Sequence, residues 1–287
     1  MTSGHDHDRG LSFDLRTMAG RRLMDRRRAL QVVAGAGLAA LVGCGSGDDG
    51  GRADATTTST ERSTSTAAGS GARSAGGSAE CSTIPEETAG PFPGDGSNGP
   101  DVLAADGIVR ADIRPSFGSA TGRAEGVPVT LDLEILDGAG GCAPLAGAAV
   151  YVWHCDRDGR YSLYSPGATG ENYLRGVQPA DADGAVSFAT IFPGCYPGRW
   201  PHIHFEVYPS VADATGGGSA LVTSQLAIPE DACNQVYAAD GYAQSVTNLE
   251  ALALESDMVF ADGTDLQLAT ATGSAVDGFA LRLSMVV

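Results

Sequence analysis

Two histidines separated by one residue are the first feature of this sequence that could do chemistry. His202 and His204 flank Ile203, and on a β-strand residues two apart point to the same face of the sheet. Both imidazoles could therefore reach one metal ion, because neutral imidazole is the commonest metal ligand in proteins. By itself the pair is a weak signal, since such histidines are as often surface residues as ligands.

The residues before this pair strengthen the metal interpretation. Tyr196 and Arg199 lie in the stretch 193–201, which is rich in Gly and Pro and leads directly into His202. A second tyrosine, Tyr161, follows a polar turn farther upstream. If these residues act together, the fold must bring the end of one strand and two turns to the same place.

The hydrophobic pattern predicts strands that could position these turns. Apolar residues alternate with polar residues or proline over 127–135, and a period of two marks a strand with one buried face. Further strands are expected at 148–154, 185–191, 202–208, 221–228 and 279–287. Helical turns are expected after Pro229 and over 248–255. The sequence therefore predicts an all-β fold, a β-sandwich of mainly antiparallel strands with long loops and one or two short helices.

Several motifs in this order resemble a known enzyme family. They are PEETAGPF at 85–92, the segment from Trp153 to Tyr161, LRG at 174–176 and the turn and histidine pair at 193–204. With these motifs the chain resembles the intradiol ring-cleavage dioxygenases, iron(III) enzymes that open catechols between the two hydroxyl carbons. The resemblance covers most of residues 81–287 and is closest to the compact secreted branch, similar to the protocatechuate 3,4-dioxygenase core. It implies cleavage of a catechol-type ring with O2 to a cis,cis-muconate-type diacid.

The resemblance also implies the ligands of the metal. By match, Tyr161 and Tyr196 are phenolate ligands of Fe(3+), His202 and His204 are its imidazole ligands, and Tyr196 is the ligand that the substrate displaces. Chemistry agrees with this set, because Fe(3+) favours anionic oxygen donors and lowers the pKa of a phenol far below its free value of about 10. Ferrous oxygenases use a different set, with two histidines and one carboxylate.

Two catalytic residues are implied beside the ligands. Arg199 matches a family arginine near the substrate ring, where a fixed cation would stabilise the negative charge that develops as O2 attacks. Gln225 matches a family glutamine in the pocket. Tyr164 competes with Tyr161 as a ligand, but Tyr161 has the family spacing after its turn, so Tyr164 is expected to pack or to line the rim. Three further residues are expected to be packing residues, namely Trp153, His154 and Trp200.

Composition limits the substrate and the partners. The 287-residue chain has a formal net charge of −17, and all 18 of its basic residues are arginine. The absence of lysine excludes Schiff-base and phosphate-loop lysines, and so acidic a chain should repel nucleic acid and anionic membranes. It also argues against carboxylated catechols, unless Arg157, Arg160 or Arg175 supplies a local cation. The expected partners are a small aromatic diol and O2, and the strand edges of a sandwich leave a homodimer open.

Three regions follow from the composition along the chain. Residues 1–44 have the parts of an export signal, with adjacent arginines that resemble a twin-arginine motif and a lipobox-like end at Cys44. Residues 45–80 are rich in Gly, Ser and Thr and contain no large apolar residue, which predicts a disordered tether. Residues 81–287 are then the catalytic domain. Export by the twin-arginine or the general route, with lipid attached at Cys44, would place this domain on the outer face of the bacterial cell membrane.

Five cysteines follow the one in the lipobox-like segment. They are Cys81, Cys142, Cys155, Cys195 and Cys233. In an exported chain they would fit two disulfides and one free thiol, but their spacing leaves the pairing open.

Two other functions remain open on the sequence alone. A non-catalytic β-sandwich surface module would share the pattern of strands and turns, but it would need no paired histidines and tyrosines. A copper- or zinc-binding lipoprotein would use His202 and His204 and would tolerate the loss of both tyrosines. A ferric dioxygenase would not tolerate that loss.

Overall fold

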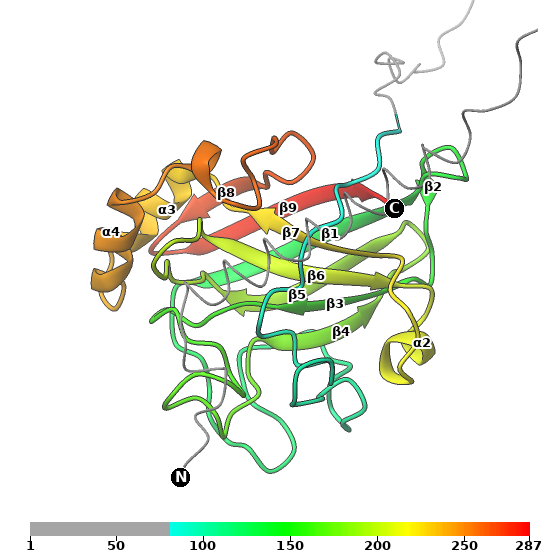
Figure 1. Ribbon diagram of the computed structural model, residues 1–287, viewed down its shortest axis with the longest axis horizontal. Helices are drawn as coiled ribbons and strands as arrows, with labels where there is room; N and C mark the ends of the chain where they lie inside the picture. The colour runs from blue at the N-terminus through cyan, green and yellow to red at the C-terminus, as the bar shows by residue number, and fades with distance from the viewer. Residues whose placement is uncertain (1–80) are drawn as a thin grey trace, which may run out of the picture. The chain divides into compact units, whose positions relative to one another are not determined.

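The described part of the chain is residues 81–287, which form two β-sheets with a shared hydrophobic core in this computed structural model (Figure 1). The fold class expected from the sequence, a mainly antiparallel β-sandwich, is confirmed. The predicted export signal over 1–44 and the predicted tether over 45–80 lie outside the described residues, and both stay predictions. No helix within 81–287 has the length and apolar character needed to span a membrane.

One sheet has five strands and includes the alternating strand. β1 covers Pro128–Asp137 and pairs in parallel with β9, Gly278–Val286, which pairs with β8, Thr270–Ser274. On its other side β1 pairs antiparallel with β5, Ala185–Ile191, and with β2, Ala143–Pro144. Every second residue of β1 over most of its length is buried in the core between the sheets, as the alternation predicts.

The other sheet has four strands in the order β4-β3-β6-β7, and all neighbours are antiparallel. In that order their bounds are Arg175–Pro179, Ala149–Trp153, His202–Tyr208 and Val222–Ala227. Ile203 belongs to the core between the sheets, so His202 and His204 point to the outer face. All seven residues of β6 are nevertheless buried, because loops cover that outer face.

The helices are short and lie outside the sheets. They are α2, Val211–Thr215, α3, Glu230–Tyr237, α4, Ala243–Glu250, and a single 3-10 turn η2, Leu254–Ser256. The helix predicted after Pro229 is confirmed as α3. The helical turns predicted over 248–255 are confirmed in part, because α4 extends to Glu250 and η2 starts at Leu254. The prediction missed the start of α4, where Tyr242 and Ser245 hydrogen-bond to the chain around 192–195. The sequence analysis did not predict β2, β4, β8 or α2.

The cysteines form one disulfide rather than two. Cys81 is bonded to Cys142, whereas Cys155, Cys195 and Cys233 are free and buried. Each free thiol contacts a backbone carbonyl oxygen in the packed interior. The expectation of two disulfides was therefore wrong, since the interior packs all three remaining cysteines as thiols.

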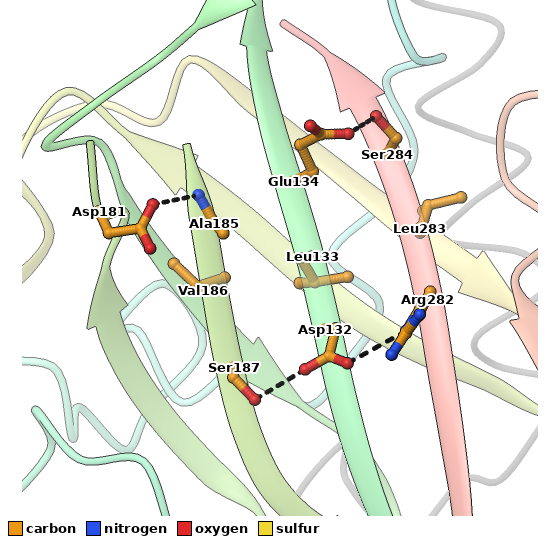
Figure 2. A pocket seen from close by; sticks show the side chains of 10 residues that line it. All are labelled: Asp132, Leu133, Glu134, Asp181, Ala185, Val186, Ser187, Arg282, Leu283 and Ser284. Carbon is orange, nitrogen blue, oxygen red and sulfur yellow. Dashed lines mark hydrogen bonds and ion pairs between the residues drawn. The ribbon is translucent and has the colours of Figure 1, made fainter. Parts of the chain in front are cut away.

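A hollow of about 340 Å³ lies on the outer face of the five-stranded sheet (Figure 2). Its polar side chains, charged groups and serine hydroxyl groups, bind one another across β1, β5 and β9. Asp132 accepts hydrogen bonds from Ser187 and Arg282, and Glu134 accepts one from Ser284. This hollow belongs to the sheet that carries none of the predicted site residues.

The disulfide should contribute measurably to stability. Cys81 and Cys142 are 61 residues apart, and closing a loop of that length restricts the unfolded chain enough to stabilise the fold by about 4 kcal/mol. We expect Cys142→Ser to lower the free energy of unfolding by an amount of that order in urea titrations. A reductant should cause a similar loss in the unsubstituted chain and no further loss in the variant. Equal stability of the two chains under oxidising conditions would contradict the prediction.

Candidate metal centre

Four side-chain donor atoms meet on the outer face of the four-stranded sheet. Nε2 of His202 lies 3.1 Å from Nε2 of His204, 3.2 Å from the hydroxyl oxygen of Tyr196 and 3.4 Å from that of Tyr161. The rings of the two tyrosines meet edge to face, with centroids 5.9 Å apart. The structure therefore brings all four predicted ligands together.

The β6 strand and its neighbours orient the two imidazoles. His204 is the register partner of Trp153 on β3, and the two rings stack with centroids 4.9 Å apart and planes 5° from parallel. Nδ1 of His202 donates a hydrogen bond to the carbonyl oxygen of Trp200 at 2.5 Å. Because a carbonyl can only accept, this bond leaves Nε2 of His202 unprotonated and free to bind a cation.

A carboxylate organises the turn that delivers Tyr161. Asp156 is buried and accepts hydrogen bonds from the backbone N–H groups of Asp158 and Arg160, at 3.0 and 2.9 Å. It also accepts one from the hydroxyl group of Tyr173 at 3.0 Å. These bonds hold the polar turn in one shape and place the next side chain, Tyr161, beneath the loops.

Two glycines let the tyrosine turns pack closely. Gly159 adopts a φ of 79°, and a Cβ there would lie 3.0 Å from Cβ of Tyr196. A Cβ on Gly194 would lie 2.4 Å from the carbonyl oxygen of Arg157, far closer than atoms approach without bonding. Glycine at both positions is therefore what permits Tyr161 and Tyr196 to approach the same point.

The segment 85–93 covers the site from another direction. The ring of Phe92 lies 4.9 Å from that of Tyr161. Arg175, fully buried, donates hydrogen bonds to the carbonyl oxygens of Phe92 and Pro93, at 2.9 and 2.7 Å. The segment thus brings an aromatic ring against a ligand and helps to exclude water from it.

Burial controls the proton chemistry of the four donors. Burial raises the pKa of Tyr161 and of Tyr196 above the ordinary value for a phenol. It lowers the pKa of His202 to about 3 and that of His204 well below its usual range. All four groups are therefore neutral near pH 7 in the metal-free chain. A bound cation would reverse the effect on the phenols, because it stabilises their anionic form.

The spacing of the donors fits a metal ion. Protein nitrogen and oxygen atoms bind a first-row metal such as zinc at about 2.0–2.2 Å, so neighbouring ligand atoms must lie about 3 Å apart. Hydrogen bonding alone does not explain the cluster, because the unprotonated Nε2 of His202 has a single lone pair and three polar atoms near it. Nδ1 of His204 is buried and has no hydrogen-bond partner within 81–287. The residues present therefore fit a metal held by two imidazoles and two phenol oxygens.

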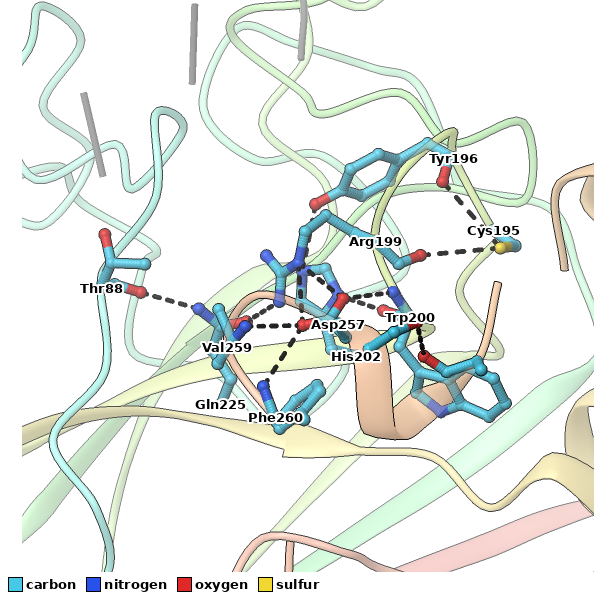
Figure 3. Close-up of polar contacts among 12 residues, drawn as sticks. Thr88, Cys195, Tyr196, Arg199, Trp200, His202, Gln225, Asp257, Val259 and Phe260 are labelled. Carbon is cyan, nitrogen blue, oxygen red and sulfur yellow. Dashed lines mark hydrogen bonds and ion pairs between the residues drawn. The ribbon is translucent and has the colours of Figure 1, made fainter. Parts of the chain in front are cut away.

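Arg199 lies buried beside these donors and is held at two of its nitrogens (Figure 3). Nε donates to Oδ2 of Asp257 at 3.0 Å, and Nη2 donates to Oε1 of Gln225 at 2.7 Å. Gln225 in turn donates to the carbonyl oxygen of Thr88 at 2.8 Å. Nη1 has no hydrogen-bond partner in the described part of the chain, so it is available to a bound molecule.

Two residues that the sequence analysis expected to be packing residues are placed away from the donors. His154 donates from Nδ1 to the carbonyl oxygen of Cys155 at 2.8 Å and accepts at Nε2 from Thr190 at 2.7 Å, so neither nitrogen is left for a metal. The hydroxyl group of Tyr164 hydrogen-bonds within 94–98. Tyr161, and not Tyr164, is the tyrosine that reaches the histidines.

The three arginines considered as substrate cations are all engaged elsewhere. Arg157 pairs with Glu125 at 2.8 Å, and Arg160 pairs with the two carboxylates of its own turn. Arg175 is buried and donates to backbone carbonyl oxygens and to hydroxyl groups of the interior. None of the three is therefore without a partner in this structure, and a role for one of them toward a carboxylated substrate stays a prediction.

Asp257 is the site residue that the sequence analysis missed. It lies 58 residues after Arg199 and follows η2. A single acid before the apolar residues at 258–260 is typical of a capping residue, and its carboxylate does accept from the N–H group of Val259 at 2.9 Å. That local signal marks a turn, but nothing in the sequence links it to Arg199.

Comparison with known proteins identifies the family. A family model described as Dioxygenase matches residues 110–266, which is more than half of the chain and includes the four predicted ligands. The chain belongs to the intradiol ring-cleavage dioxygenase family. The intradiol ring-cleavage dioxygenase from Tetranychus urticae is similar in structure, with a TM-score of 0.55 over 72% of this chain and 94% of that chain. At 24% sequence identity, this likeness shows the fold of the chain and nothing more.

A second relative matches locally. Over 54 residues the chain is 44% identical to the chlorocatechol 1,2-dioxygenase of Rhodococcus opacus. These residues are 18% of this chain and 21% of that protein. The match therefore spans about a fifth of the length of that curated relative. It supports membership of a family of ring-cleaving dioxygenases and does not transfer the relative's substrate.

The buried histidines predict how the stability of the metal-free dioxygenase depends on pH. Burial lowers the pKa of His154 to about 4 and that of His202 to about 3, whereas unfolded histidine has a pKa of about 6.5. Between these values the unfolded chain binds more protons than the folded chain, so stability falls as the pH is lowered. We expect the free energy of unfolding in urea to fall from pH 7.5 to pH 5, with a shallower fall in His154→Gln. A constant or rising free energy over this interval would contradict the prediction.

Proposed function

We propose that the chain is a non-haem iron(III) dioxygenase that cleaves a catechol-type ring with O2 between its hydroxyl carbons, giving a cis,cis-muconate-type diacid. The observation that carries this proposal is the meeting of two phenol oxygens and two imidazole nitrogens. The hydroxyl oxygens of Tyr161 and Tyr196 and Nε2 of His204 all lie within 3.4 Å of Nε2 of His202. Iron(III), when bound there, would draw electron density from a chelated catechol and make the ring reactive toward O2.

The two tyrosines suit different parts in this chemistry. Tyr161 is 2% exposed, under Phe92, whereas Tyr196 is partly exposed. A permanent ligand should be closed off from water, and a ligand that leaves when the substrate binds needs room to move. The exposures therefore support Tyr161 as the permanent phenolate and Tyr196 as the one displaced by substrate. Once released, Tyr196 would carry a proton, because burial raises its pKa.

Arg199 supplies a fixed positive charge beside the donors. Two of its nitrogens are occupied by Asp257 and Gln225, which sets the plane of the guanidinium group and leaves Nη1 for the substrate. A donor oriented before the reaction needs no rearrangement when negative charge develops on the ring. Arg199 is 3% exposed, and burial strengthens such an electrostatic interaction.

The charges near the site favour an uncharged ring substituent. Each of the eight arginines within 81–287 forms an ion pair with a carboxylate or donates to a carbonyl oxygen. The charge of Arg199 is balanced by Asp257, so the negative charge of a carboxylated catechol would meet no uncompensated cation beside the donors among the described residues. We propose catechol or an alkyl- or hydroxy-substituted catechol as the substrate.

The two other functions considered from the sequence account for less of this geometry. Within 81–287 no three His, Cys, Asp or Glu side chains are placed to share a metal ion, so a copper or zinc site without the tyrosines would have two protein ligands only. A non-catalytic module would give no reason for these four donors to meet beside a buried arginine. Anchoring of the enzyme at Cys44 on the outer face of the cell membrane stays a prediction outside the described residues.

The ligand assignment predicts the effect of removing one phenol. Tyr161→Phe should lose bound iron, the tyrosinate-to-iron(III) absorption that gives such proteins a reddish colour, and O2 uptake with catechol. Tyr164→Phe is the matched control, because it removes a phenol three residues away that does not reach the histidines. We expect the control to keep all three properties, measured by metal analysis, visible spectroscopy and an oxygen electrode. Full activity of Tyr161→Phe would overturn the assignment, and a colourless unsubstituted protein after iron reconstitution would overturn the proposed function.

Substrate choice gives a separate prediction. Because the charge of Arg199 is already balanced by Asp257, kcat/KM for catechol should exceed kcat/KM for protocatechuate, its carboxylated analogue. We expect a factor of at least about ten, which corresponds to about 1.4 kcal/mol. Initial rates of O2 consumption over a range of both substrates measure this ratio. A preference for protocatechuate would show that the charges of the site are wrongly assigned.

A further inference from the structure

We propose that Asp257 is a positioning residue of the site, which orients Arg199 directly and orients the imidazole of His202 through the backbone of Trp200. This inference rests on the proposed function and adds a residue that orients the catalytic arginine and a proposed metal ligand. Asp257 comes from the chain after η2, far in sequence from the strand that carries the histidines.

The carboxylate of Asp257 is itself held rigidly (Figure 3). Oδ1 accepts a hydrogen bond from the N–H group of Val259 at 2.9 Å, and Oδ2 accepts one from the N–H group of Trp200 at 2.7 Å. Arg199 is therefore not its only partner. A carboxylate fixed by the backbone can impose its own direction on a flexible guanidinium side chain.

Trp200 carries the second connection. Its N–H group donates to Asp257, and its carbonyl oxygen accepts from Nδ1 of His202 at 2.5 Å. Its indole N–H donates to the carbonyl oxygen of Ile228 at 2.8 Å. Trp200 is thus held at its backbone N–H by Asp257 and at its ring by Ile228, the residue that follows β7. Its carbonyl oxygen therefore presents a fixed acceptor to the imidazole of His202. Groups that orient a metal-bound histidine in this way set its ring plane and its tautomer.

The charge of Asp257 also has a particular use at this place. The pair that it forms with Arg199 has side-chain exposures of 1% and 3%, and no other salt bridge given for the described residues has both partners buried. A buried cation needs a partner, because removing one member of such a pair leaves an uncompensated charge. A bound iron ion would repel the guanidinium group as well. Asp257 allows a fixed cation to remain beside a cationic metal.

The first experiment replaces Asp257 by its neutral isostere. Asp257→Asn keeps the size of the side chain and one carbonyl oxygen but removes the charge. We expect the variant to retain iron, to show a displaced tyrosinate-to-iron(III) band and to lose about tenfold to hundredfold in kcat, with a smaller change in KM. Asp132→Asn is the control, since it breaks an exposed pair with Arg282 on the other sheet and should change neither. An Asp257→Asn enzyme with the original kcat and spectrum would overturn the proposal.

The two connections are separated by repeating the substitution without Arg199. In an Arg199→Ala background, Asp257→Asn should cause little further loss of kcat, because the two residues act together on turnover. It should still displace the absorption band, because that effect passes through Trp200 and His202. Additive losses of kcat, or a band that no longer moves, would each refute the corresponding connection.

Two further measurements cover a poorly folding variant and a failed function. If Asp257→Asn does not fold, Asp257→Glu keeps the charge and displaces it by one carbon. If Asp257→Glu has the melting temperature of the unsubstituted protein and a reduced kcat, the result supports a positioning role for Asp257. An unchanged kcat in this variant refutes that role. If the unsubstituted protein shows neither the iron band nor O2 uptake, the proposed function fails by itself. The positioning of His202 by Asp257 is then tested in the metal-free protein, by the NMR signal of the hydrogen-bonded Nδ1–H group of His202. Asp257→Asn should shift or broaden this signal, and an unchanged signal would refute the positioning role.

Discussion

The register of β6 between its two neighbours is the constraint on which the site depends. Trp153 of β3, His204 of β6 and Gln225 of β7 are register partners in one row across the sheet. A slip of one residue would turn both histidines toward the core and place Ile203 under the loops. That slip is opposed by Ile203 and Phe205, which are buried between the sheets in the present register. Hydrophobic packing on one face of a strand thus determines the chemistry on the other.

Loops then convert this row into an enclosed site. Each loop is held by hydrogen bonds or by close glycine contacts, so the side chains that it delivers have little freedom. Burying four polar donors and an arginine is unfavourable by itself. The compensation comes from specific partners, which are Trp200 for His202 and Asp257 with Gln225 for Arg199. His204 is held instead by stacking on the ring of Trp153. Burial removes these groups from water, which costs free energy on folding. The same burial lowers the local dielectric constant and so strengthens the electrostatic interactions within the site.

The sequence predicts the parts of this site that are local and misses those that depend on contacts between distant segments. The alternation around Leu131 and the spacing of His202 and His204 report directly on strands, because side chains in a strand alternate. Tyr161 could be preferred to Tyr164 only through resemblance to a family, since both follow the same turn. The pairing of Asp257 with Arg199 and the free thiols depend on how loops fold back on the sheets, which no local pattern encodes.

The segment 85–93 has an evolutionary consequence. The hydrogen bonds that join it to β3, β4 and β7 use its own backbone: its carbonyl oxygens accept from Tyr151, Arg175, Ser224 and Gln225, and one of its N–H groups donates to Thr223. Mutations can therefore exchange the side chains of this segment without removing the bonds that hold it in place. Over generations such a wall can be reshaped residue by residue while the four proposed ligand positions stay unchanged. Under the proposed function, the reaction can then be inherited while its substrates diverge.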